Sequence, residues 1–493
     1  MGSLDPNKLI GLPTELFMQI TGYLSTDDHW SLALSVPKIP RFMVPVLRHL
    51  HLCVFQTAED GWRNDTTFIL AFLYKFPVYA DQIYHIAVDL HTEPPKSDPT
   101  TMRLDYLISE WDRIPWLANW SKNYHDMVRR SSAHTSGIPD ELSSRWSSLR
   151  HPSVFDEVEL IQDTDVVLWD LAIILAQGTR ICKMDLAFMC EKLKPMSIDM
   201  GHIGMLCLEP AFRCFRKRGQ GLEQFNISTP VRDQRYSRCG DRRIATLLSA
   251  AFVLPRIRHL KLTRLFDTYK HNGDWSLYTG VVVDKITIED CRLQRRLLPR
   301  LLHAVNGLHE LEGHVLPYSG FGNHILTNHG KPRDIKAGLF IHRQTLQSLY
   351  IHRIPGDMSA FTKLKSLIVA TESAYHLGGN KPLCQLLPQS LHSLASNLRK
   401  PASLAWIFEL EALASDIKTG NTFPHLVHIS RRDLFANRLS NSQEALEQDR
   451  RMTQALRSVG IDYCHVPKRV GDFIRDENCT GACGKQRKDD ITP

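Results

Sequence analysis

The sequence of 493 residues lacks any long apolar run. Its most apolar window, 166–176, contains Asp170 and is far shorter than the about 20 apolar residues that span a bilayer. The first residues also lack the basic start and the apolar stretch of a secretory signal peptide. These absences predict a protein that is neither embedded in a membrane nor exported, with a cytoplasmic or nuclear location.

A strong charge of one sign is missing as well. Lys and Arg number 60 and Asp and Glu number 53, which leaves a formal net charge of only +7. This mild basicity does not indicate nucleic acid as a partner, and the hydrophobic content of 43% excludes a wholly disordered chain. The 11 cysteines follow no disulfide-framework spacing. We therefore expect a globular chain with about three domains or a repeat array.

The motifs of common enzyme classes are also absent. The sequence has no G-x-S-x-G, no H-E-x-x-H and no complete phosphate-binding loop. Cys479 and Cys483, with Cys464 and His465 upstream, have a metal-like spacing, and we interpret them as reduced thiols in a polar tail. The sequence thus predicts a protein that is not an enzyme, with no catalytic residue, no metal site and no cofactor.

The N-terminal segment carries the most informative pattern. Pro13 is placed as the first residue of a helix, where its missing N–H costs nothing. Apolar positions then recur every four residues, as on one helical face: Leu16, Ile20 and Leu24. Phe17 and Tyr23 widen this face. An amphipathic helix is therefore expected near the start of the chain.

Two further short helices are expected next. Leu32 and Val36 belong to the first of them, which prolines at 37 and 40 end, and an apolar and basic stretch over 41–52 forms the second. Three short helices are too few to bury a core of their own. We therefore expect this segment to dock on a partner.

The run from Leu12 to Asp28, LPTELFMQITGYLSTDD, resembles the opening of an F-box. The family pattern is L-P-x-E, two or three apolar residues, x-I-x-x-Y/F-L and a short polar break. The order and spacing match over this run. The chain departs from the family at His29-Trp30, where an aliphatic residue is usual, and at Pro37 and Pro40, where the family has a continuous helix.

This resemblance implies a substrate-recognition subunit of an SCF-type (cullin-RING) ubiquitin ligase. The segment would bind the Skp-type adaptor and, through it, the cullin and RING subunits, while the rest of the chain recruits an unknown protein substrate. The residues that the resemblance assigns to the adaptor are Leu12, Pro13, Leu16, Ile20, Leu24, Leu32 and Val36. The helical face by itself predicts only that a partner helix docks there.

The rest of the chain repeatedly shows an apolar-x-x-apolar-x-apolar run. The runs begin at Ile83, Ile181, Leu222, Ile257, Val283, Leu346 and Leu364. In leucine-rich repeats such a run forms a short parallel strand whose last two apolar residues point inward. The stretch from Val283 to Leu293 fits the whole template, with Cys291 at the Asn/Cys ladder position. The other repeats are irregular, as in fungal F-box proteins with leucine-rich-like repeats, which the chain resembles.

The expected fold class is α/β, with an N-terminal three-helix F-box followed by an irregular leucine-rich-repeat-like solenoid of short parallel strands plus helices. We expect a helix from Leu293 that Pro299 kinks, a helix over 440–458 that Gly460 ends, and a closing strand over 461–464. The expected divisions are an N-terminal tail (1–8), the F-box (9–54), a first sheet and helix segment (55–120), a polar insertion or loop (121–153), a repeat-like substrate-binding domain (154–465) and a disordered C-terminal tail (466–493).

Two other functions stay open. One is an F-box scaffold that binds the adaptor outside the ligase. The other is a nucleic-acid or phospho-ligand binding protein that uses basic clusters, which we interpret instead as solvated surface. These clusters are Arg213, Arg216, Lys217 and Arg218; Arg232, Arg235, Arg238, Arg242 and Arg243; and Arg292, Arg295, Arg296 and Arg300. Tyr236 is the only aromatic residue in the middle cluster, so base stacking is not indicated.

Overall fold

The fold is described from a computed structural model. It describes residues 11–24, 28–29, 32, 40–56, 62–64, 69–70, 72–73, 75–90, 171–188, 208, 211–213, 215–228, 242–265, 280–289, 291, 297–314, 332–351, 356–369, 382–398, 404–420, 422–433 and 443–467. The expected α/β class is confirmed, because these residues form helices and a mainly parallel sheet. The chain divides into two compact units, unit 1 (1–283 and 291–293) and unit 2 (284–290 and 294–493).

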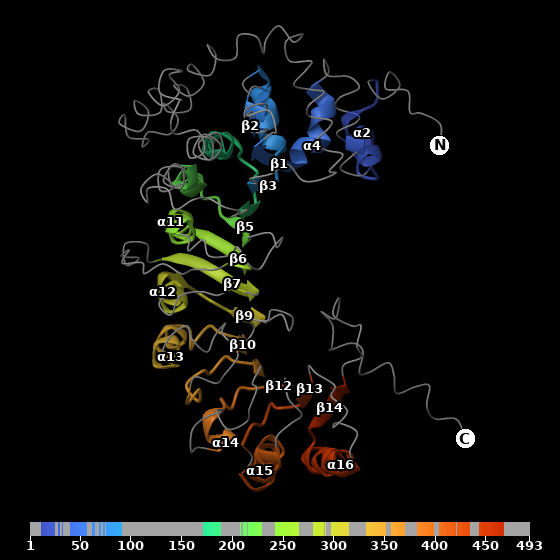
Figure 1. Cartoon of the computed structure of the whole chain (residues 1–493), viewed down its shortest axis with the longest axis vertical. Coiled ribbons are helices and arrows are strands. Elements are labelled where there is room, and N and C mark those ends of the chain that lie inside the picture. Colours follow the sequence, from blue (N-terminus) through green and yellow to red (C-terminus); the bar gives the residue numbers. More distant parts are fainter. Residues whose placement is uncertain are drawn as a thin grey trace, which may run out of the picture. The chain divides into compact units, whose positions relative to one another are not determined.

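Unit 1 is a parallel sheet that the N-terminal helices precede (Figure 1). Its helices with described bounds are α2 (Thr14–Thr21), η1 (Pro40–Met43), α4 (Val44–Arg48), η2 (Pro77–Gln82) and α11 (Arg242–Ala251). Its strands are β1 (His49–Gln56), β2 (Trp62–Asn64), β3 (His85–Leu90), β4 (Lys183–Phe188), β5 (Leu222–Ser228), β6 (Arg256–Thr263) and the start of β7 (Val281–Glu289). Strands β1, β3, β4, β5 and β6 pair in this order, all parallel, and β2 pairs antiparallel with β1.

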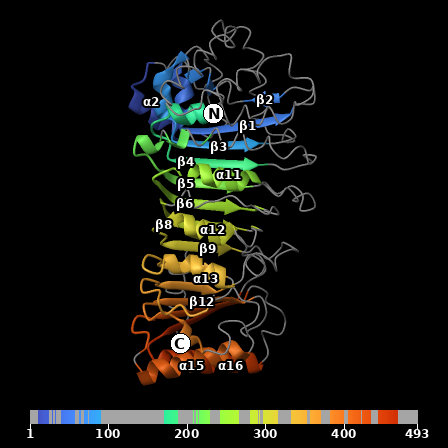
Figure 2. The same cartoon turned by 90° about the vertical axis from the view of Figure 1, so that its left-hand side faces the viewer.

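Unit 2 repeats the same construction. Its strands are the rest of β7, β8 (Val305–Asn306), β9 (Glu310–His314), β10 (Ser348–Ile351), β11 (Ser366–Val369), β12 (Ser393–Leu398), β13 (His428–Asp433) and β14 (Asp462–Pro467). Its helices are α12 (Leu297–Ala304), α13 (Pro332–Ile341), α14 (Leu383–Leu386), α15 (Leu404–Gly420) and α16 (Gln443–Ser458). The strands from β9 to β14 pair in sequence order, all parallel, and β7 pairs with β9. Helices α12 and α13 cover one side of the strands (Figures 1 and 2).

The core of each unit consists of rows of apolar side chains that run across the strands. In unit 1 two neighbouring rows are fully or almost fully buried, and in unit 2 a similar row includes Ile286, Leu311 and Leu349. The unit 1 rows are Leu50, Ile86, Met184, Phe225 and Leu260, and Leu52, Val88, Leu186, Ile227 and Leu262. Burial at about 25 cal/mol per Å² of apolar surface makes these rows the main stabilising element of the sheet.

All seven strands expected from the apolar runs are present, and the inward pairs of apolar residues are buried, as predicted. Cys291 also has the expected ladder role. The Leu265 N–H donates to its Sγ at 3.4 Å, and its thiol donates to the Leu262 carbonyl at 3.2 Å. A buried cysteine thus satisfies backbone groups of the neighbouring turn.

Strands β9, β12 and β13 are not among the strands that the apolar runs predict. Each has a non-apolar residue or glycine at the second inward position: Gly313 in β9, Ser396 in β12 and Arg431 in β13. The first inward residue of each strand is nevertheless apolar and buried. Pairing with two parallel neighbours therefore outweighs one unfavourable side chain.

Two local expectations are wrong, and a third is not tested. The helix expected over 41–52 ends at Arg48, because the alternation His-Leu-His-Leu from His49 starts strand β1. Pro13 is the residue before the first helical residue of α2, rather than that residue itself. Pro299 lies in the first described turn of α12, and residues 293–296 lie outside the described part, so the expected start at Leu293 and the kink at Pro299 stay predictions. Helix α16, Gly460 after it and strand β14 agree with the expectations.

Helices α12 and α13 approach each other closely at a glycine. A Cβ at Gly338 would lie 2.9 Å from the Cβ of Leu302. Just beyond α13, the buried His342 donates from Nε2 to the Leu302 carbonyl at 2.8 Å. Burial lowers the pKa of His342, which keeps its imidazole neutral.

Among the described residues, no helix combines the length and the apolarity that crossing a bilayer requires.

The approach of β5 to β6 generates a first prediction. A Cβ at Gly221 would lie 2.5 Å from the backbone oxygen of Arg256, and backbone cannot move aside as a flexible side chain can. We expect Gly221→Ala to lower the free energy of unfolding by about 1–3 kcal/mol, measured by urea denaturation.

Gly11→Ala is the matched control, because nothing lies within 4 Å of a Cβ at that position. Equal stability of the two variants would show that the contact between Gly221 and Arg256 does not limit the sheet.

Candidate interaction surfaces

Helix α2 is held to the rest of unit 1 by one aromatic side chain. Phe17 is fully buried, and its ring lies 5.5 Å from that of Phe42, at an angle of 53°. The Arg41 guanidinium lies over the Phe17 ring, 4.6 Å from its centroid, in a cation–π contact. We call Phe17 and Phe42 the anchor pair.

The end of α2 is also secured. The Gly22 N–H donates to the Met18 carbonyl at 3.0 Å, and the Thr21 hydroxyl donates to the same carbonyl at 3.2 Å. The Thr21 carbonyl accepts a hydrogen bond from His29 Nε2 at 2.7 Å. His29, where the F-box pattern has an aliphatic residue, thus connects the next helical residues to the end of α2. No pattern in the sequence indicates this contact.

The residues assigned to the adaptor divide between two sides of α2. Pro13 is exposed, and Leu16 leaves 47% of its surface exposed. Leu12, Ile20 and Leu32 are partly buried and pack against the anchor pair. Leu24 is partly buried, and Val36 lies outside the described residues.

Two side chains that were expected to widen the face behave differently. Phe17 is the anchor itself, and Tyr23 is 91% exposed. Leu16 and Gln19 are exposed residues of α2, and Tyr23 lies just beyond its end. The face available to a partner therefore runs along Pro13, Leu16 and Tyr23, with Ile20 at its margin.

The second surface is the side of the unit 1 sheet that faces away from the buried rows. Because side chains alternate along a strand, pairing that buries one side aligns the outward residues in rows as well. The first row is His49, His85, Lys183, Gln224 and His259, and the second is His51, Ala87, Asp185, Asn226 and Lys261. We call these two rows the histidine face.

A hydrogen-bonded cluster lies in the middle of the histidine face. His85 Nε2 lies 2.7 Å from Asp185 Oδ2, and Asn226 Nδ2 donates to Asp185 Oδ1 at 2.5 Å. The side chains of His85 and Asp185 remain 25% and 34% exposed. Burial lowers the pKa of His49, and the positive charges of His85, Lys183, Arg48 and His29 lower it further.

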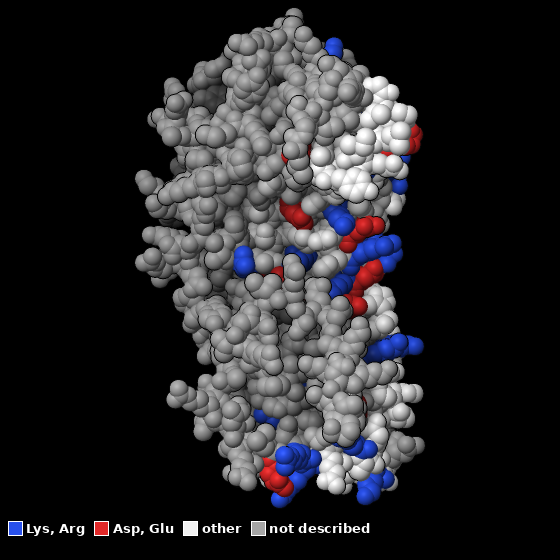
Figure 3. Space-filling model, turned by 90° about the vertical axis from the view of Figure 1, so that its right-hand side faces the viewer, with Lys and Arg blue, Asp and Glu red and all other residues white. Residues whose placement is uncertain are grey.

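The outward side of unit 2 has a different chemistry. Lys285 Nζ lies 2.7 Å from Glu312 Oε1 and 3.2 Å from Glu310 Oε2, so its charge is compensated locally. Burial lowers the pKa of Lys285, but the hydrogen bonds and charges of the two glutamates outweigh that effect and raise it. The row continues with Ser348, Ser366 and Ser393. Lys, Arg, Asp and Glu side chains of both signs lie next to one another on the molecular side drawn in Figure 3.

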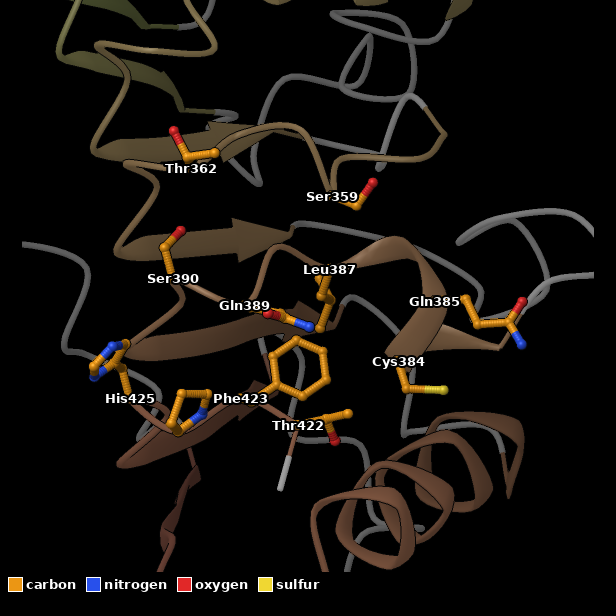
Figure 4. A pocket seen from close by; sticks show the side chains of 11 residues that line it. Ser359, Thr362, Cys384, Gln385, Leu387, Gln389, Ser390, Thr422, Phe423 and His425 are labelled. Atoms are coloured by element: carbon orange, nitrogen blue, oxygen red, sulfur yellow. The ribbon is translucent and has the colours of Figure 1, made fainter. Parts of the chain in front are cut away.

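Unit 2 also contains a cavity of about 520 Å³ at the turns that precede β11, β12 and β13 (Figure 4). Its lining is mostly neutral, with hydroxyl, amide, apolar and thiol groups. The Ser390 hydroxyl has a structural role, since it donates to the Phe361 and Leu364 carbonyls. His425 stacks on His392, with ring centroids 5.3 Å apart.

Cys384 in this cavity is a poor nucleophile. Burial, with a hydrogen bond from the thiol to Asp416 and the negative charge of that residue, raises its pKa to about 11. The thiolate is the reactive form, so little of it is present near neutral pH. The cavity therefore lacks an activated cysteine.

The basic clusters lie partly outside the described residues. Arg213, Arg216 and Lys217 are exposed, as expected of solvated surface. Arg218 has a structural role, because its guanidinium donates to the carbonyls of Leu175 and Ala176 at 3.4 and 3.2 Å. Arg300 is partly buried, whereas no side chain of the middle cluster is described, nor are Arg292, Arg295 and Arg296.

Two further predicted features lie outside the described residues. Cys479 and Cys483 lie beyond the described residues, as does the polar stretch over 121–153. Within the described part of the chain, no group of three or more His, Cys, Asp or Glu side chains is arranged to hold a metal ion. Neither a protein-family model nor a curated protein matches this sequence.

The raised pKa of Cys384 generates a second prediction. Relative to a thiol with the ordinary pKa of 9.0, a pKa of about 11 lowers the thiolate fraction at about pH 8 roughly 100-fold. We expect iodoacetamide to modify Cys384 correspondingly slowly in the native protein, measured by peptide mass spectrometry. Asp416→Asn should accelerate the reaction, because it removes the negative charge beside the thiol.

Glu411→Gln serves as the control, since it removes a carboxylate from the same helix α15 at a partly buried position. Alkylation of native Cys384 at the rate seen in the denatured protein would contradict the assignment.

Proposed function

We propose that this protein is a substrate-recognition subunit of an SCF-type ubiquitin ligase, which binds the Skp-type adaptor through its N-terminal segment. The observation that carries the proposal is the different exposure of two neighbouring side chains on α2. Phe17 is buried in the anchor pair, while the adjacent Leu16 remains half exposed. The same helix carries the L-P-x-E run that resembles an F-box.

The energetics of such docking are favourable. Full burial of a leucine side chain contributes about 1.5–3 kcal/mol before ordering costs. Those costs are reduced here because the anchor pair and the bond from His29 already hold the helix in place. Leu16, Pro13 and Tyr23 would supply most of the apolar contact, and Ile20 would extend it.

The finer architecture belongs to the same proposal. Residues 9–54 would form a three-helix F-box, and the strands and helices that follow would form an irregular leucine-rich-repeat-like solenoid. The parallel strands of both units, several of which are separated by helices, support this interpretation.

In this proposal the chain makes and breaks no bond itself. It would hold a protein substrate near a ubiquitin-loaded enzyme and so raise the effective concentration of the two reactants. The outward rows of the sheet are the surface that the fold leaves for the substrate. The protein would act where the ligase acts, in the cytoplasm or the nucleus.

Adaptor binding is tested by co-purification of the full-length protein with a recombinant Skp-type adaptor. We expect Leu16→Asp to lower adaptor recovery at least about tenfold, because it puts a charge into an apolar interface. Leu16 suits this test better than Ile20, since Ile20 packs against the anchor pair and its replacement would disturb the fold.

Val78→Asp is the matched control, because Val78 is an exposed aliphatic residue of unit 1 on the separate helix η2. It should leave recovery unchanged. Equal recovery of the adaptor by wild type and Leu16→Asp would refute the proposed docking face.

A further inference from the structure

We propose that the histidine face binds an acidic polypeptide segment of about six residues. The inference rests on the proposed function, since it names the class of substrate that this sheet would recruit. It follows from the spacing of the two outward rows, from their charges and from the hydrogen-bonding groups that they present.

The spacing of the strands sets the length of the ligand. Neighbouring strands lie about 4.8 Å apart, so a row that crosses β1, β3, β4, β5 and β6 measures about 19 Å. An extended chain advances about 3.3 Å per residue, so about six residues cover the row. A shorter segment would leave His49 or His259 without a contact.

The charges of the two rows favour an anion. They contain Lys183, Lys261 and four histidines, so basic side chains outnumber acidic ones on the two rows. Asp185 is the only acidic side chain within these rows, and it already accepts from His85 and Asn226. Glu223 and Arg258, exposed at the starts of β5 and β6, add one charge of each sign.

The environment of His49 also favours a negatively charged ligand. The groups whose charges act on it are Arg48 beside it, His29, His85 on β3 and Lys183 on β4, and all of them disfavour its protonation. An incoming carboxylate would offset these positive charges and so favour the protonated form of His49. His85 is faced by His49 and by Asp185, which lies 2.7 Å away.

A polypeptide fits these rows better than a nucleic acid does. Tight binding to nucleic acid uses many phosphate contacts, typically from arginine and lysine, together with aromatic platforms for the bases. The two rows offer two lysines, no arginine and no aromatic ring other than imidazole. An extended segment of six residues turns about three carboxylates toward the sheet, since alternate side chains point away, and these can accept from the imidazole and ammonium donors of the rows.

The test is fluorescence anisotropy with a labelled peptide of six consecutive glutamates and the full-length protein, at about pH 6.5 and low salt. We expect Lys183→Glu with Lys261→Glu to weaken binding at least tenfold. Asp185→Asn should have the opposite effect and strengthen binding, because it removes the one acidic charge of the rows and keeps an oxygen that can accept from His85.

The matched control is Lys363→Glu with Lys365→Glu, an equal change of net charge at two exposed lysines of unit 2. It should bind the peptide as wild type does. Equal weakening by the two lysine pairs, or no binding to the wild type, would overturn the proposal. Tighter binding of an oligouridylate of similar length, lost in the Lys183 and Lys261 variant, would overturn the assignment to a polypeptide.

Failure of this inference can be told apart from failure of the proposed function. The lysine variants lie on the sheet, so they should still co-purify with the adaptor if α2 docks on it. Retained adaptor recovery with no peptide binding would leave the docking face intact and remove only the acidic substrate. Circular dichroism identical to wild type verifies that each variant is folded.

Discussion

The burial of matched apolar rows between parallel strands is the constraint on which the described structure depends. In unit 1, Phe225 lies between Met184 and Leu260, and each of these side chains is fully buried. A shift of one residue in any pairing would turn apolar side chains outward and polar ones inward. The register that buries the core thus also aligns His85 with Lys183 on the other side of the sheet. The histidine face is in this sense a consequence of the core.

The N-terminal segment is connected to this sheet without a flexible break in the described part. Helix α4 ends at Arg48 and β1 begins at His49, so the two elements are consecutive in the chain. The Arg48 carbonyl accepts from the Tyr84 N–H, and its guanidinium lies 5.9 Å from the centroid of the Tyr84 ring. The anchor pair then connects η1 to α2. A partner held on α2 would therefore be held at a defined position relative to β1 and β3.

The sequence predicted most of the sheet because one pattern, two apolar residues separated by one position, marks the buried side of its strands. Two apolar residues separated by one position are buried wherever a strand has parallel neighbours on both sides, and seven strands could be found in this way. The pattern fails where the second inward position is Gly313, Ser396 or Arg431, since neighbouring strands compensate for the missing apolar side chain. Strand β1 was missed for another reason. The apolar and basic stretch over 41–52 was interpreted as one short helix, although His49 to Leu52 alternates as a strand does.

The sequence predicted the candidate docking helix but not which of its residues would remain available. A period of four places Ile20 and Leu16 on one face, yet Ile20 packs against the anchor pair while Leu16 stays half exposed. The difference arises from Arg41 and Phe42, which follow α2 in the sequence and contact its Phe17. These contacts determine which side of α2 is covered. No local pattern contains that information. Likewise, the histidine face joins residues from strands far apart in sequence, and only the register of the sheet shows that they are neighbours. A surface of this kind can discriminate among partners through charge while the buried rows alone maintain the fold, so its side chains can be exchanged at little cost in stability.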